Sequence, residues 1–175
     1  MKTFKLVSIL AIAIMCAVAA NGQVELGKID GTLQKQIGAS LTSYYELKDA
    51  MVDSDADIAA MKAEDLVAAF SAIEVSKMTA AQKAYWAKLE SPLKTDARHI
   101  NENTDLEHQR EHFMKLSNNM YALVFGFKAN KTEAYLQYCP MKKASWLSES
   151  KEIRNPYYGS KMLTCGSVKA TLKKN

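Results

Sequence analysis

The chain has 175 residues and a formal net charge of +4, and 48% of its residues are hydrophobic against 24% that are charged. So small a charge, without a concentrated basic face, excludes nucleic-acid binding as an expected function. The length is that of a single domain with one hydrophobic core, so the sequence does not call for a second domain.

The first 22 residues have the organisation of a cleavable signal peptide. Two lysines are followed by an apolar stretch from Leu6 to Ala20 and then by a short polar exit, which predicts cleavage after residue 22. The apolar stretch is shorter than the roughly 20 residues that a membrane span needs, so no span is expected after processing. A lipid anchor on Cys16 is disfavoured because no small residue directly precedes it. We therefore expect an exported, periplasmic protein whose single domain is residues 23–175.

The first half of the mature chain predicts two amphipathic helices. Apolar residues recur every three or four positions from about Gly31 to Val52, which gives one stripe along the first helix. Ser54 or Asp55 can cap a second helix, whose stripe begins with small residues. Small residues at that position permit close contact between the two helices.

Two further helices complete the expected bundle, which covers about residues 28–128. Thr79 can cap the third helix, and Pro92 within it predicts a kink or a local break. The fourth helix starts after Thr104 or Asp105 and has the clearest apolar seam. Four helices with short links favour antiparallel neighbours, so the expected fold class is all-α, an up-down four-helix bundle.

An irregular C-terminal segment, about residues 129–170, is expected to follow the bundle. Glu133–Tyr138 alternates and is rich in aromatic residues, which predicts a short strand or part of a hairpin. Asn155–Gly159 contains proline and ends in glycine, as turns do. Because Trp146 and Leu147 need burial, we expect this segment to fold back over the bundle as a lid.

Two cysteines and two methionines of the C-terminal segment form a candidate soft-metal site. Cys139 and Met141 precede the turn, and Met162 and Cys165 follow it. Thiolate and thioether sulfur suits Cu(I), so these four residues are candidate copper ligands. The alternative is a Cys139–Cys165 disulfide, common in exported proteins, with the methionines as packing residues. A metal and a disulfide exclude one another here.

Three histidines lie in one window between the third and fourth predicted helices. His108 and His112 are four residues apart and project from one helix face, so they can chelate zinc or copper. The alternative is a solvated His108 and a boundary His112. His99 falls in the same window, at the end of the third helix. Gln109, on the apolar face, is expected to be buried and to bond a tyrosine or a backbone group of the C-terminal segment.

The sequence contains no recognisable catalytic motif. Ser117 and Ser148 have no base at motif spacing, and neither Gly-x-Ser-x-Gly nor a glycine-rich phosphate loop occurs. We therefore expect a protein without enzymatic activity.

Three parts of the chain resemble a known family. They are Tyr45–Asp55, His108–Ser117, and a C-terminal set made of Tyr138–Met141, Trp146–Ser148 and Asn155–Gly166. Together they resemble a domain-of-unknown-function family of Bacteroidetes periplasmic proteins, which also occurs as a C-terminal extension of CusB-type heavy-metal efflux adaptors. The resemblance covers nearly the whole mature chain, and its C-terminal signature is the specific part.

The resemblance implies a periplasmic four-helix domain associated with heavy-metal handling. It implies Cys139, Met141, Met162 and Cys165 as ligands, with His112 and then His108 as additions, for a copper ion with Cu(I) favoured over zinc. Nothing in the chain resembles the hairpin and barrel regions of the adaptors, which favours a free-standing carrier or accessory that meets an efflux adaptor or another periplasmic protein. The alternative function is a non-enzymatic interaction module in which the two cysteines form a structural disulfide.

Overall fold

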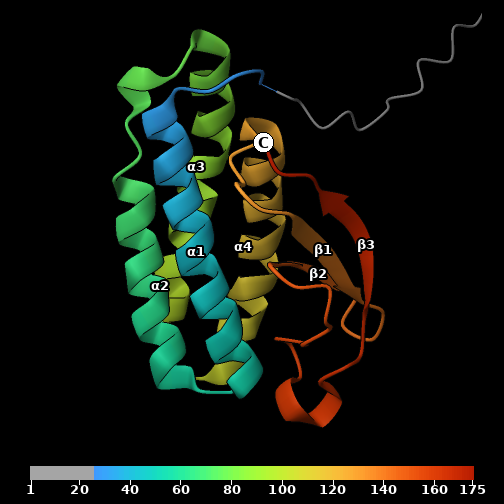
Figure 1. The fold of residues 1–175 in the computed structure, drawn as a ribbon. Coiled ribbons are helices and arrows are strands. Elements are labelled where there is room, and N and C mark those ends of the chain that lie inside the picture. Colours follow the sequence, from blue (N-terminus) through green and yellow to red (C-terminus); the bar gives the residue numbers. More distant parts are fainter. Residues whose placement is uncertain (1–25) are drawn as a thin grey trace, which may run out of the picture.

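Four helices form an up-down bundle in the computed structural model, which describes residues 26–175 (Figure 1). The predicted signal peptide and Cys16 lie outside the described residues. Successive helices pack side by side, joined by short links and one 3-10 turn, Val75–Lys77. None of the helices in the described part is both long and apolar enough to cross a lipid bilayer. The helices are α1 (Gly31–Asp53), α2 (Ala56–Ser71), α3 (Ala80–Asn101) and α4 (Leu106–Phe127).

Side-chain caps explain where the helices begin. Asp55, Thr79 and Asp105 each accept a hydrogen bond from a backbone N–H in the first turn of the helix that follows. Thr79 forms a capping box with Gln82, whose side chain bonds back to the Thr79 N–H. The helical bundle predicted from periodicity is thereby confirmed. The predicted break at Pro92 is wrong, because α3 continues through the proline as one helix.

A three-stranded antiparallel sheet follows the bundle, so the predicted all-α class is wrong. Its strands are β1 (Ala134–Cys139), β2 (Ala144–Ser148) and β3 (Ser167–Leu172), in the order β2-β1-β3. Only β1, which contains most of the alternating Glu133–Tyr138 stretch, gives a clear period of two in the sequence. Most residues of β2 are buried, and the first half of β3 is exposed, so neither strand alternates between buried and exposed positions.

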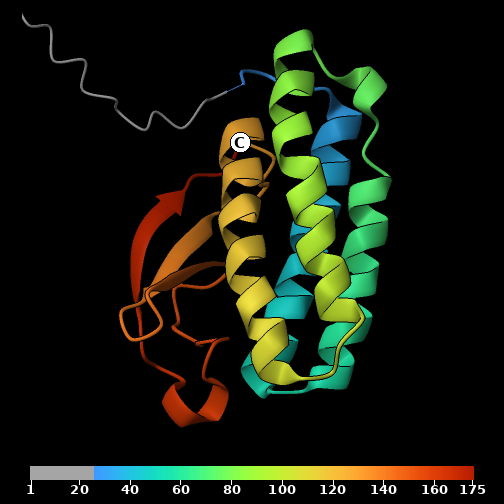
Figure 2. The same ribbon diagram turned by 180° about the vertical axis from the view of Figure 1, so that it is seen from behind.

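The sheet packs against α4, on the far side of the bundle from α2 (Figure 2). Trp146 and Leu147 of β2 are fully buried, and Tyr157 from the following turn is 1% exposed. The Tyr44 hydroxyl accepts the Leu147 backbone N–H at 3.1 Å and lies 2.8 Å from the Ser117 hydroxyl of α4. The C-terminal segment therefore folds back over the bundle, as predicted from its buried aromatic residues.

Candidate metal centre

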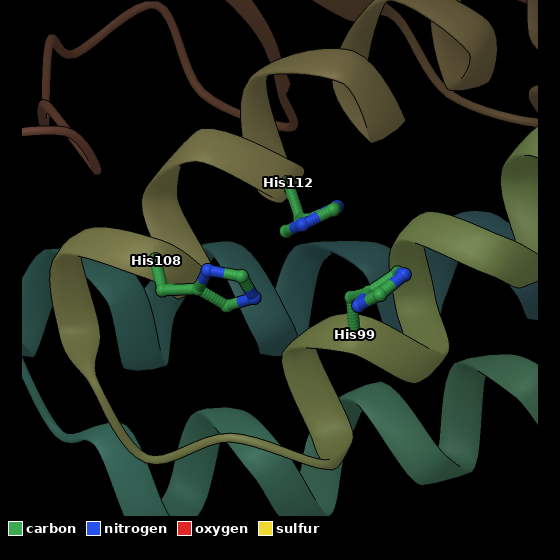
Figure 3. Close-up of side chains that lie close together, drawn as sticks. All are labelled: His99, His108 and His112. Carbon is green, nitrogen blue, oxygen red and sulfur yellow. The ribbon is translucent and has the colours of Figure 1, made fainter.

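Three histidine side chains meet at the end of the bundle where α3 leads into α4 (Figure 3). His99 lies in the last turn of α3, and His108 and His112 lie in the first two turns of α4. The rings of His99 and His112 stack with centroids 4.3 Å apart, and the His108 ring lies 4.7 Å from that of His112. One ring nitrogen from each residue falls within 4.8 Å of the other two. We call these residues the histidine cluster.

The short link between α3 and α4 brings the three residues together. α3 ends at Asn101, and the Asp105 side chain accepts the N–H groups of Glu107 and His108 at 2.9 and 3.2 Å. α4 therefore begins just before His108, and the spacing of four residues places His108 and His112 on one face. Because the two helices are antiparallel neighbours, that face meets the end of α3, where His99 lies.

Gln109 holds this link in place. Its side chain is fully buried, and Nε2 donates to the carbonyl oxygens of Ala56, Ile100 and Asn103 at 2.9, 3.1 and 2.7 Å. Two of those carbonyls lie between His99 and His108 in the chain. The predicted burial is confirmed, but the predicted partners in the C-terminal segment are wrong, because the amide bonds the ends of the helices instead.

A buried carboxylate orients the central ring of the cluster. Asp96 is 6% exposed, and its Oδ1 lies 2.8 Å from Nδ1 of His112. An ionised carboxylate only accepts hydrogen bonds, so Nδ1 of His112 is the donor, and in the neutral ring the lone pair on Nε2 is left for a ligand. A carboxylate bonded to the outer nitrogen of a metal-binding imidazole is a common arrangement that fixes both its tautomer and its orientation.

The histidine cluster offers three imidazole nitrogens and leaves a fourth position open. Imidazole suits zinc and copper, and zinc–nitrogen bonds are about 2.0–2.1 Å long. Donors in a tetrahedral site with such bonds lie roughly 3.3 Å apart, so the ring nitrogens, which lie within 4.8 Å of one another, have to approach by no more than about 1.5 Å around an ion. His99 is exposed, whereas His108 and His112 are half-buried, so its ring is the most free to make that movement.

The two cysteines of the C-terminal segment lie at one end of the sheet, apart from the link between α3 and α4. Cys139 ends β1 and Cys165 lies just before β3, and their sulfur atoms are 3.7 Å apart, with both thiols free. Met141, in the turn after β1, is 63% exposed. Met162 is half-buried at the end of the 3-10 turn Gly159–Met162.

The six residues predicted as ligands therefore fall into two groups. One group pairs His108 with His112, and the other contains the two cysteines with a methionine in each adjoining turn. Our sequence prediction omits His99 from the ligands because it relies on the spacing within one helix. The signal that identifies His99 is its position at the end of a helix that a short link joins to an antiparallel helix.

A family model matches part of the chain. The family model described as "Protein of unknown function (DUF3347)" matches residues 41–132, slightly more than half of the chain. That range contains the histidine cluster and ends before β1, so it leaves out both cysteines. No curated protein and no solved structure matches the chain. The chain belongs to the DUF3347 family, a family of proteins of unknown function.

Proposed function

We propose that this protein binds a divalent transition-metal ion, Cu(II) or Zn(II), through His99, His108 and His112, and acts as a periplasmic metal carrier. The convergence of three imidazoles from two helices carries the proposal. Neutral imidazole is the commonest metal ligand among protein side chains, and Asp96 already orients one of the three rings.

A site with only three protein ligands suits a metal carrier better than it suits a protein that holds a structural ion. Structural zinc sites are normally closed by four protein ligands, whereas three ligands leave a position for water or for an incoming ligand. His99 is exposed, so the open side of the cluster is reached from solvent. A partner protein can then take the ion by stepwise ligand exchange through that side.

The proposed cellular context comes from the sequence. A signal peptide over residues 1–22 would deliver the chain to the periplasm. The resemblance to Bacteroidetes periplasmic proteins and to extensions of CusB-type efflux adaptors suggests that such a partner belongs to a heavy-metal efflux system. The protein would then act as a carrier or accessory, without catalysing a reaction.

Competitive titration of the purified protein tests the proposal. Zn(II) and Cu(II) are added in the presence of a coloured chelator, and the ion taken by the protein is counted. We expect one ion per chain, with affinity falling as the pH is lowered because protons compete for the imidazoles. A protein that removes neither ion from the chelator contradicts the proposal.

Asp96→Asn tests the outer carboxylate. The amide oxygen can still accept a hydrogen bond from the His112 ring, but the negative charge beside that ring is lost, so we expect zinc affinity to fall roughly 10–100-fold. Glu111→Gln is the matched control, because Glu111 is an exposed acid beside His112. Circular dichroism should give the same helix content for both variants. Equal zinc affinity in the two variants would argue against the role of Asp96.

A further inference from the structure

The sheet brings two thiols together at a place remote in sequence from the histidine cluster. β1 and β3 run antiparallel with Tyr138 opposite Ser167, so the residues beyond each end of that pair come to the same edge. Cys139 follows Tyr138, and Cys165 comes two residues before Ser167. The strand register therefore places the two sulfur atoms 3.7 Å apart, although 26 positions separate them in the chain.

The environment of Cys139 favours its thiolate. Its side chain is fully buried, and the Lys142 backbone N–H donates to its sulfur at 3.4 Å. Burial opposes ionisation, but hydrogen bonds from the Lys142 amide and the Asn155 side chain outweigh it and lower the pKa of the Cys139 thiol. Burial and the neighbouring Cys139 together raise the pKa of the Cys165 thiol. Cys139 therefore loses its proton more readily than Cys165 does.

We infer that Cys139 and Cys165 form a second metal site, which takes Cu(I) as a bis-thiolate complex. Two sulfur ligands about 2.3 Å from a metal lie roughly 3.8 Å apart in a tetrahedral site and roughly 4.6 Å apart when the ion sits in line between them, so the spacing of 3.7 Å has to widen by no more than about 1 Å. Each thiol that binds as a thiolate releases its proton to solvent, and no electron is transferred. Thiolate is the donor that selects soft, monovalent copper.

Access and neighbouring donors agree with this site. Cys165 is half-exposed while Cys139 is sealed inside, so an ion enters from the Cys165 side. The Cys165 N–H donates to the Met162 carbonyl at 3.0 Å, which places this thioether residue in the same turn. Met141, with its exposed side chain, lies in the turn that holds the Lys142 amide. The thiol pair therefore suits a softer ion than the imidazoles do. The two sites share no ligand, so the thiol site can bind its ion whether or not the histidine site does.

Titration of the whole reduced protein with Cu(I) under anaerobic conditions tests the site, with a coloured Cu(I) chelator as competitor. We expect Cys139→Ser and Cys165→Ser each to weaken Cu(I) binding by more than ~100-fold, because loss of a ligand exceeds the roughly 10–100-fold cost of losing an outer partner. Cys165→Ser keeps the test informative if the buried Cys139→Ser variant fails to fold. Met162→Leu, which nearly conserves volume, should weaken binding if its thioether is a third ligand.

His108→Ala is the matched control, and it separates the two proposals. It should retain the Cu(I) affinity of the unaltered protein while losing affinity for Zn(II), whereas the cysteine variants should do the reverse. Unchanged Cu(I) affinity in Cys165→Ser would overturn the thiol site without touching the histidine site. A thiol count in denaturant, on protein recovered from the periplasm, is the second measurement: two thiols support the site, and none, which indicates a disulfide, overturns it.

Discussion

Replacing His112 by alanine is expected to lower affinity for Zn(II) or Cu(II) by more than ~100-fold, because a ligand is lost together with the ring that its outer carboxylate orients. His112 is the central member of the cluster: it stacks on His99, lies next to His108, and bonds Asp96. Competition against a chelator measures the change in affinity, and urea unfolding of the metal-free protein measures the change in stability.

A second histidine variant separates binding from folding. His112→Ala leaves the buried Asp96 without its hydrogen-bond partner and so costs some stability. His99 is exposed, so His99→Ala should leave the free energy of unfolding almost unchanged and still weaken metal binding. Glu111→Ala, an exposed change on the same helix, is the control. Full affinity in both histidine variants would rule out the proposed ligand set.

Arg110→Ala is expected to reduce the free energy of unfolding by about 3–6 kcal/mol, since two buried carbonyls lose a charged donor worth roughly 1.5–3 kcal/mol each. Arg110 is 4% exposed; Nε donates to the Pro156 carbonyl at 3.0 Å and Nη2 to the Met51 carbonyl at 3.2 Å. Nη2 also bonds the Ser54 hydroxyl at 3.0 Å. One side chain thus joins α4, the end of α1 and the turn between β2 and β3.

Urea unfolding followed by tryptophan fluorescence measures this loss, with Lys115→Ala as the control. Lys115 is exposed on the same helix, so its removal should change stability by no more than a few tenths of a kcal/mol. The ion pair of Arg110 with the exposed Glu107 contributes little because water screens it. A loss below about 1 kcal/mol for Arg110→Ala would mean that water replaces the guanidinium at both carbonyls.

The helices could be predicted because their signals are local. The apolar period of α4 and the Thr79–Gln82 capping box involve residues within a few positions of one another, so a single sequence contains the whole signal. β3 is the opposite case. It pairs with β1 across some 30 residues, and three of its six residues are exposed, so its own sequence has little to mark it as a strand.

In the histidine cluster, too, part of the arrangement follows from local sequence and part only from the packing of the helices. The pair of His108 and His112 follows from spacing on one helix, whereas the approach of His99 depends on how α3 and α4 pack. Asp96 lies three residues before His99 on α3, and nothing in the sequence singles it out. Only the packing of the helices places it 2.8 Å from His112. Tertiary contacts therefore supply both the third donor and the orienting carboxylate.

Nitrogen-15 NMR of the histidine side chains during titration with Zn(II) tests the histidine site most directly. The account predicts that the ring nitrogens of His99, His108 and His112 all change together and reach saturation at one equivalent. His112 should keep the proton on Nδ1, which donates a hydrogen bond to Asp96, and should bind the ion through Nε2. Ring signals that stay unchanged, or a change confined to one histidine, would contradict a shared ion at this site.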